Sequence, residues 1–81
     1  MYIVYILRSE KDNKRYIGMT QSLERRLKEH YNGQVKSTKN RRPLILFYTE
    51  KFSTKEEASL REEFFKTGKG REFLNSKEKG A

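Results

Sequence analysis

A chain of 81 residues, 33% hydrophobic and 37% charged, has room for one folded domain with a small buried core. Nineteen lysines and arginines against eleven acidic residues give a formal net charge of +8, which favours a polyanionic partner such as nucleic acid. The absence of cysteine excludes disulfides and thiolate metal sites and fits a cytoplasmic protein, while no apolar run reaches the ~20 residues of a membrane span, so we expect no membrane contact.

The first two elements along the chain are predicted to form a β-hairpin. Residues 2–7 (YIVYIL) are β-branched and aromatic on both faces, which predicts a buried strand. Residues 11–14 have the composition of a turn, and residues 15–19 (RYIGM) predict the second strand. Gly18 lies near its end, where a missing side chain permits a close approach or a bend.

The hairpin carries three tyrosines. Tyr2 and Tyr5 differ in parity, so they are expected on opposite faces of their strand, and Tyr16 lies in the second strand. For any one of them, a core aromatic with a hydrogen-bonded hydroxyl is the simpler interpretation. A tyrosine acting as a general base needs its pKa of about 10 lowered, or a cation or metal beside it.

An amphipathic helix is predicted over residues 22–31, with Ser22 as its N-cap and a stop at residues 32–33 (NG). Its apolar face consists of Leu23, Leu27 and Tyr31.

Two polar residues of this helix lie beside its apolar face. Arg26 and His30 are spaced i, i+4 and should sit at the edge of the buried stripe, where a helix borders a cleft. An arginine there can bind a phosphate through two hydrogen bonds, and a histidine can transfer a proton. A solvated basic surface is the alternative interpretation.

Residues 34–42 lack apolar periodicity and predict a basic loop, which the only proline, Pro43, closes. Its cations are Lys36, Lys39, Arg41 and Arg42. Such cations can contact a polyanion or can simply keep a surface soluble.

A third strand is predicted at residues 44–48 (LILFY), followed by two helices. Thr54 and Glu57 match a capping box, and this helix is expected to run to about Lys66, with Gly68 as its stop. A short helix at residues 71–76 and a frayed tail at about 77–81 complete the chain.

The order ββα–loop–βαα predicts an α/β fold in which helices flank a small antiparallel three-stranded sheet. We expect one domain over residues 1–81.

One carboxylate of the penultimate helix is a candidate metal ligand. Glu62 lies about 40° from Ala58 around the helix, at the margin of the apolar side, although periodicity does not separate it from Glu63. Mg²⁺ keeps several waters and often takes one or two protein carboxylates, so one Glu can suffice. A solvated edge residue is the alternative. In the same helix, Glu57 and Arg61 have the i, i+4 spacing of an ion pair.

Taken together, these segments resemble the GIY-YIG nuclease superfamily over essentially the whole chain. Residues 3–5 (IVY) and 16–18 (YIG) resemble its two half-motifs, with Ile and Val where the family name has Gly and Ile. Residues 23–30 (LERRLKEH) resemble its first helix and residues 57–62 (EASLRE) its later helix. Residues 65–74 resemble the ending of small stand-alone bacterial members.

The resemblance implies a GIY-YIG-like site with the catalytic residues Tyr5, Tyr16, Arg26, His30 and Glu62. One of the two tyrosines would help deprotonate the attacking water. Arg26 would stabilise charge on the scissile phosphate, while His30 would assist proton transfer or hold a tyrosine. Glu62 would bind one Mg²⁺ or Mn²⁺ ion.

We therefore expect a metal-dependent endonuclease acting on DNA, with a role in repair, and with RNA as the other candidate substrate. The cations expected along the phosphate backbone are Lys36, Lys39, Arg41, Arg42, Lys66, Lys69 and Arg71. Asn75 is the nearest match to a later asparagine of the family, but its surroundings match poorly and it receives no role.

The alternative function is a nucleic-acid-binding module with weak or no nuclease activity that assists a partner protein. Its motivation is length, because we expect little room here for the recognition domain that family nucleases usually carry.

Overall fold

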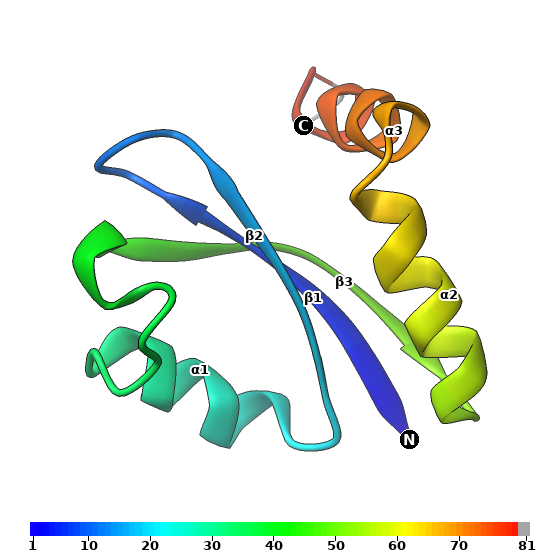
Figure 1. The fold of residues 1–81 in the computed structure, drawn as a ribbon, viewed down its shortest axis with the longest axis horizontal. Coiled ribbons are helices and arrows are strands. Elements are labelled where there is room, and N and C mark those ends of the chain that lie inside the picture. The colour runs from blue at the N-terminus through cyan, green and yellow to red at the C-terminus, as the bar shows by residue number, and fades with distance from the viewer. Residues whose placement is uncertain (80–81) are drawn as a thin grey trace.

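The structure is a computed structural model that describes residues 1–79. Strands β1 (Tyr2–Ser9), β2 (Arg15–Thr20) and β3 (Leu44–Phe52) form an antiparallel sheet in the order β2-β1-β3 (Figure 1). β1 is the central strand, which explains why its sequence is apolar on both faces. The predicted α/β fold with a small antiparallel three-stranded sheet is confirmed.

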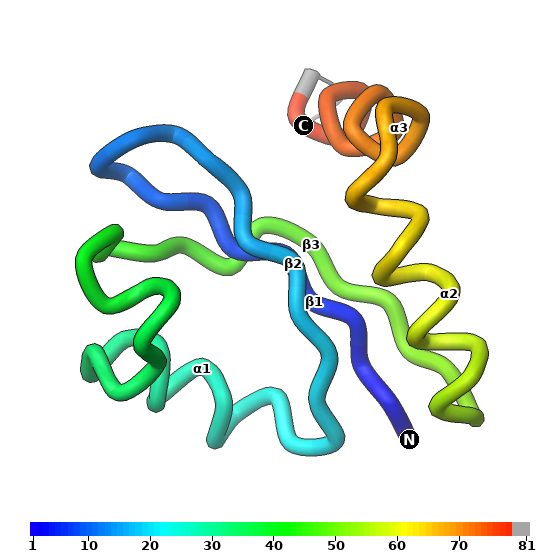
Figure 2. Tube along the Cα trace, in the orientation of Figure 1, coloured from blue at the N-terminus to red at the C-terminus, as the bar shows by residue number. Residues whose placement is uncertain are grey.

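Helices cover both faces of this sheet. Helix α1 (Leu23–Tyr31) lies on one side, and α2 (Lys55–Phe65) and α3 (Gly68–Lys79) lie on the other (Figure 1). The connection between α1 and β3 contains a short 3₁₀-helix, η1 (Lys39–Arg41), and packs against the end of the hairpin, where the amide of Glu10 donates to the carbonyl of Pro43 (Figure 2).

The alternation of side chains along β1 divides the core into two parts. The part facing α2 and α3 contains the buried residues Val4, Ile6, Ala58, Phe65 and Leu74. The part facing α1 contains the buried residues Tyr5, Leu7 and Leu44, with Leu23 and Leu27 of α1 packed against them. Tyr2 packs with the first part and Tyr5 belongs to the second, as their parity predicts.

β3 is four residues longer than predicted and carries a bulge. Its pairing with β1 continues to Phe52 through polar residues, which an edge strand tolerates on its solvent side. Between the pairs Ile6–Tyr48 and Leu7–Leu46 the register skips Phe47. Both Phe47 and Tyr48 consequently pack toward α2 and α3.

The caps of the helices follow the sequence closely. Thr54 caps α2 as predicted, and its hydroxyl oxygen accepts from the amide of Glu57 at 3.2 Å. Ser22 occupies the N-cap of α1 without a side-chain cap hydrogen bond, and Gly33 after this helix has a φ of +76°. A φ of that sign favours glycine, as a helix stop requires.

The expected ion pair between Glu57 and Arg61 is not the one that forms. Arg61 instead binds Glu50 of β3 through two hydrogen bonds of 2.7 and 3.1 Å. Its guanidinium also lies 4.5 Å from the ring centre of Phe64. Tyr48 donates to the same carboxylate at 2.6 Å, so this cluster ties α2 to β3.

The last helix differs most from the prediction. α3 begins at Gly68, which was expected to end the preceding helix, and continues through Lys79, beyond the expected 71–76. The predicted tail at 77–81 is thus helical as far as Lys79, and residues 80–81 lie outside the described residues. None of the helices within residues 1–79 combines the length and apolarity needed to cross a bilayer.

We expect Gly70→Ala to lower the free energy of unfolding by about 1–3 kcal/mol. A Cβ at this position would lie 2.1 Å from the carbonyl oxygen of Phe64, so the backbone of the α2–α3 corner would have to move. A Cβ at Gly68 in the same helix meets nothing within 4 Å, so Gly68→Ala should be neutral or stabilising by up to ~1 kcal/mol. Urea unfolding of both variants measures the difference, and equal stabilities would contradict the close packing at Gly70.

Candidate active site

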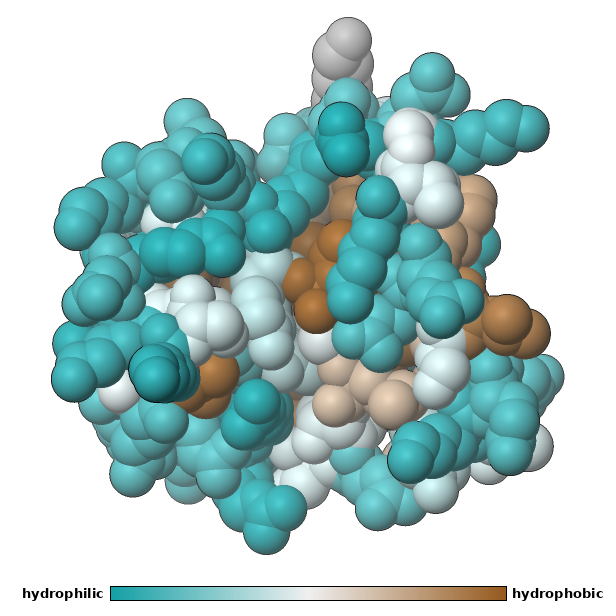
Figure 3. Space-filling view, viewed as in Figure 1, coloured by the Kyte–Doolittle hydropathy of each residue, from teal (hydrophilic) through white to brown (hydrophobic). Residues whose placement is uncertain are grey.

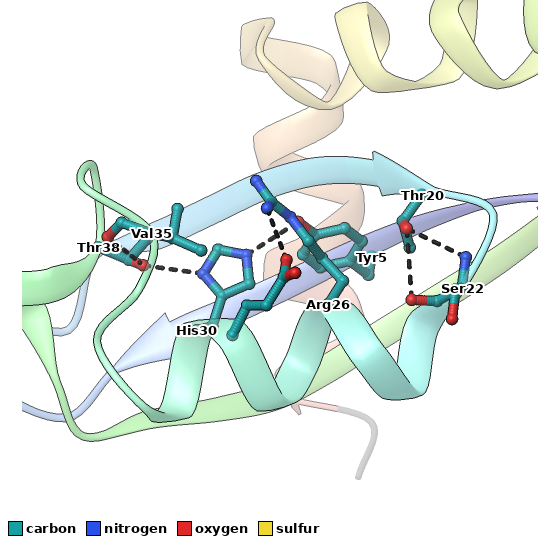
Figure 4. Close-up of polar contacts among 8 residues, drawn as sticks. Tyr5, Thr20, Ser22, Arg26, His30, Val35 and Thr38 are labelled. Atoms are coloured by element: carbon teal, nitrogen blue, oxygen red, sulfur yellow. Dashed lines mark hydrogen bonds and ion pairs between the residues drawn. The ribbon is translucent and has the colours of Figure 1, made fainter.

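A buried tyrosine hydroxyl lies at the centre of the candidate site. Tyr5 projects from β1 toward α1, with only 1% of its surface exposed. Its oxygen accepts a hydrogen bond from Nε of Arg26 at 3.3 Å and lies 2.9 Å from Nε2 of His30 (Figure 4). The i, i+4 spacing of these two residues directs both toward the sheet. His30 is fully buried, however, and does not lie at the edge of the stripe.

A loop residue completes the environment of His30. Its Nδ1 lies 2.8 Å from the hydroxyl of Thr38, which in turn lies 3.5 Å from the carbonyl of Val35 (Figure 4). Arg26 donates to Tyr5, so the Tyr5 proton is available to Nε2 of His30. His30 then donates from Nδ1 to Thr38, and Thr38 donates to Val35. This assignment gives every donor an acceptor in one direction, from Arg26 to the loop.

The ionisation states follow from burial and from Arg26. Burial raises the pKa of Tyr5, and the hydrogen bond from Arg26 opposes this only in part. Burial also lowers the pKa of His30, and the nearby charge of Arg26 lowers it further. Hydrogen bonds to Tyr5 and Glu29 raise the pKa of Arg26. At neutral pH the site therefore holds a neutral tyrosine, a neutral histidine and one fixed positive charge.

Gly18 of β2 makes room for the Tyr5 hydroxyl. The two residues are paired in the β1–β2 register, and a Cβ at Gly18 would lie 2.5 Å from the Tyr5 oxygen. Gly18 was predicted to permit a close approach, and the group that approaches it is the side chain of Tyr5.

Tyr16 lies beside this network and is more accessible than Tyr5. Two residues before Gly18, it projects from the same face of β2. Its ring centre lies 5.0 Å from that of His30 and 6.2 Å from that of Tyr5. Tyr16 is half-buried, whereas Tyr5 is fully buried, so the two side chains differ in their exposure to solvent.

Glu62 lies on the other side of β2. The hydroxyl of Ser59 is 4.0 Å from the sulfur of Met19, so α2 packs over β2, and Glu62 follows Ser59 by one helical turn. Its side chain is 24% exposed and lies 3.6 Å from Nζ of Lys66, whereas Glu63 is exposed. Within residues 1–79 no hydrogen bond or ion pair joins Glu62 to the other four predicted catalytic residues, which the structure does bring together.

The carboxylates permit a hydrated metal ion but not a multidentate site. Within the part of the chain that the structure describes, no three His, Asp or Glu side chains gather as metal ligands. Glu62 is a single half-buried carboxylate, and its ion pair with the exposed Lys66 is of the weak surface type. One or two carboxylates suffice for Mg²⁺ that keeps its waters, so Glu62 is compatible with such an ion.

The predicted nucleic-acid-binding cations fall into different surroundings. Lys39 and Arg42 line a hollow of about 690 Å³ at the α1–β3 connection. Lys66 and Arg71 line a cleft of about 900 Å³ between the hairpin and α3.

The remaining three cations line neither space. Lys36 and Lys69 are exposed. Arg41 is half-buried and turned inward, 3.5 Å from Asp12 and 3.4 Å from the carbonyl of Arg15. Arg41 therefore helps to hold the connection against the hairpin.

Two contributors to the site were not found from the sequence. Thr38 is fully buried and holds His30, but it lies in a loop without periodicity, among residues of turn-forming type. Glu29 forms an ion pair with Arg26 at 2.9 Å. In the sequence, only its position three residues after Arg26 indicates this pairing. The only available signal for Thr38 was indirect, because a buried histidine needs a partner for its second nitrogen.

Comparisons with known proteins give one matching family model and a set of similar UPF0213 proteins. The chain matches the GIY-YIG catalytic domain over residues 1–77. It is 46% identical over 67 residues to the UPF0213 protein SH2523 of Staphylococcus haemolyticus, covering 82% of this chain and 80% of that protein. It is 49% identical over 57 residues to the UPF0213 protein YazA of Bacillus subtilis, covering 69% and 58% respectively.

A solved structure shows the same fold. The solution NMR structure of the UPF0213 protein BH0048 from Bacillus halodurans aligns with a TM-score of 0.58 and 38% identity, covering 94% of this chain and 84% of that one.

We expect the free energy of unfolding to decrease as the pH falls below about 6.5, the ordinary pKa of histidine. The pKa of His30 is lowered in the folded state, so the unfolded chain takes up the proton first and acid favours unfolding. One proton gives a slope of at most about 1.4 kcal/mol per pH unit. Urea unfolding between pH 5 and 8 tests this, with His30→Gln as the control. His30 is the only histidine, so the same slope in this variant would contradict the assignment.

Proposed function

Because the chain belongs to the GIY-YIG catalytic domain family, we propose that it is a metal-dependent endonuclease that hydrolyses phosphodiester bonds in DNA. The family supports a nuclease-type hydrolase acting on nucleic acid, and its members typically use a divalent metal. The observation that carries the proposal is the network that joins Tyr5, Arg26 and His30 beside Tyr16. A cytoplasmic role in repair, on branched or damaged DNA, is part of the proposal.

We assign the deprotonation of the attacking water to Tyr16. Tyr5 is fully buried, with its oxygen already bonded to two neighbours, whereas Tyr16 is only half-buried. The ring of Tyr16 also packs against that of His30, which contacts the same Tyr5 hydroxyl as Arg26 does. In this assignment Tyr5 and His30 are positioning residues that fix Arg26 and support the Tyr16 ring.

Arg26 is suited to stabilise charge on the scissile phosphate. Its side chain is 36% exposed, so it can contact a phosphate in solvent while Tyr5 and Glu29 hold it in place. A guanidinium positioned before the reaction stabilises developing negative charge without reorganisation. A divalent ion on Glu62 would polarise the phosphate as a Lewis acid and stabilise the leaving oxygen.

We expect Glu62→Gln to lower the cleavage rate at least ~100-fold, because the metal supplies several kcal/mol of transition-state stabilisation. Purified protein is incubated with single-stranded, duplex, flap and branched DNA and with RNA, each with Mg²⁺, Mn²⁺ or EDTA. Cleavage products are resolved on denaturing gels. Glu63→Gln is the matched control and should stay within about twofold of the wild type, because this neighbour is exposed.

Equal rates for wild type and Glu62→Gln would contradict the metal assignment, and no cleavage of any substrate by the wild type would contradict the nuclease proposal. If the wild type binds DNA without cutting it, the alternative of a binding module that assists a partner protein is supported.

A separate prediction concerns Thr38. Thr38→Val keeps the shape of the side chain but removes the acceptor for Nδ1 of His30. We expect cleavage to slow about 10- to 100-fold, because a displaced His30 no longer holds Tyr16 and Arg26 in position, with Thr38→Ser restoring most of the rate. In ¹⁵N NMR spectra the single histidine should carry its proton on Nδ1 in the wild type and Thr38→Ser and change tautomer in Thr38→Val. An unchanged tautomer and rate in Thr38→Val would show that Thr38 does not position His30.

A further inference from the structure

Two arginines face each other at the turn end of the hairpin, away from the candidate active site. Arg8 of β1 and Arg15 of β2 are direct cross-strand partners in the sheet register. Like charges in directly opposite positions destabilise a strand pair unless an anion lies between them. Both side chains line the cleft between the hairpin and α3. This arginine pair therefore requires negative charge from elsewhere.

Within residues 1–79, Glu78 of α3 is the carboxylate that bridges the arginine pair. One carboxylate oxygen lies 3.4 Å from Arg8 and the other 3.4 Å from Arg15. Asn75, one turn earlier on the helix, accepts a hydrogen bond from Arg15 at 2.8 Å. The end of α3 thus occupies the arginine pair as an internal counter-ion.

The bridge leaves binding capacity unused. Its contacts of 3.4 Å exceed the ~2.7–2.9 Å of a well-formed charge-assisted hydrogen bond. Nε of Arg8 is buried and has no hydrogen-bond partner within the described residues. The guanidinium of Arg15 is held over the ring of Phe47, 5.4 Å from its centre, so it is positioned before any ligand arrives. A tetrahedral anion offers more acceptor oxygens than Glu78 supplies.

The cleft around the arginine pair has the composition of a phosphate-backbone site. Its walls carry five cations and one carboxylate, the cations being Arg8, Lys14, Arg15, Lys66 and Arg71. Its floor includes apolar residues, and apolar side chains show between hydrophilic ones in the region between β2 and α2 (Figure 3). This charge balance favours a polyanion over an acidic side chain presented singly.

The position of β2 connects the cleft to the candidate active site. β2 is an edge strand, and its residues alternate between the two sides of the sheet. Arg15 and Ile17 face the cleft, while Tyr16 and Gly18 face the Tyr5 network. A nucleic-acid strand that crosses this edge contacts both sides within a few residues.

We propose that the Arg8–Arg15 pair binds a backbone phosphate of the nucleic-acid substrate outside the scissile position, in competition with Glu78. The inference rests on the proposed function, since it concerns the same substrate. In the free protein Glu78 offsets one of the two positive charges of the arginine pair, and the incoming phosphate displaces its carboxylate.

Binding of a short fluorescein-labelled DNA duplex and of the matching single strand, followed by fluorescence anisotropy in EDTA, tests the proposal. We expect Arg15→Gln and Arg8→Gln each to weaken binding about 5- to 10-fold at low salt and to reduce the salt slope by about one. We expect Glu78→Gln to tighten binding about threefold, because the competing carboxylate is gone. Misfolding would weaken DNA binding in every variant, so it does not explain weaker binding in the arginine variants together with tighter binding in Glu78→Gln.

Matched controls separate the arginine pair from general charge effects. Lys51→Gln removes an exposed cation outside the cleft, and Glu72→Gln removes an exposed carboxylate on α3 outside the cleft. If Arg15→Gln weakens binding no more than Lys51→Gln, or Glu78→Gln tightens it no more than Glu72→Gln, the proposal is wrong. Competition by polyglutamate stronger than by unlabelled DNA would also overturn it, since the occupant would then be an acidic protein.

The same assay distinguishes failure of this inference from failure of the proposed function. Binding is measured without metal, so it does not depend on cleavage. A wild type that binds through Arg8 and Arg15 but never cuts would contradict only the nuclease proposal. A wild type that cuts while the arginine variants bind normally would contradict only the inference.

Discussion

A tyrosine hydroxyl inside a small core must have hydrogen-bond partners, because a buried polar group left unpaired costs about 1–3 kcal/mol. Much of the candidate site meets that requirement for Tyr5. Arg26 and His30 supply the partners, and Gly18 supplies the space. His30 is itself buried, so its second ring nitrogen also needs a hydrogen-bond partner, which Thr38 provides. The same hydrogen bonds that make the core stable therefore also orient the groups proposed for catalysis.

The alternation of side chains along β1 and β2 gives this small sheet two chemically different sides. On the α1 side, burial produces neutral groups around one fixed positive charge. On the α2–α3 side, the hairpin end presents several cations to solvent with few acidic partners. Because β2 is at the edge of the sheet, a single extended ligand can contact both sides. That arrangement also explains how Glu62, on α2, can belong to the same functional region without touching the tyrosines.

The sequence predicted those features that depend on contacts between residues close together in the chain. The apolar residues 2–7 identified a buried strand, and helical spacing brought Arg26 and His30 toward one side of α1. Contacts between distant segments were not predictable in this way. Arg61 pairs with Glu50 across to β3, where two carboxylate contacts and aromatic rings outweigh the local i, i+4 option.

The helix boundary at Gly68 has a similar explanation. Glycine is typical of a helix end, yet here the chain turns at residues 66–67 and starts a new helix at once. The residues around Gly68 do not reveal that Gly70 packs directly against the backbone of Phe64 in this turn. The burial of Thr38 likewise depends on the loop folding back over α1.

The alternation along β2 also limits how the length of this segment can change in evolution or by engineering. Removing or adding one residue between Arg15 and Gly18 would exchange the two sides of the sheet for every residue beyond that point. Gly18 would then no longer lie opposite Tyr5, and the space that it leaves for the Tyr5 hydroxyl would be lost. A change of one residue within β2 is therefore compatible with this architecture only where a bulge absorbs it, as one does at Phe47 of β3, whereas the turn at 10–14 is free of this parity constraint.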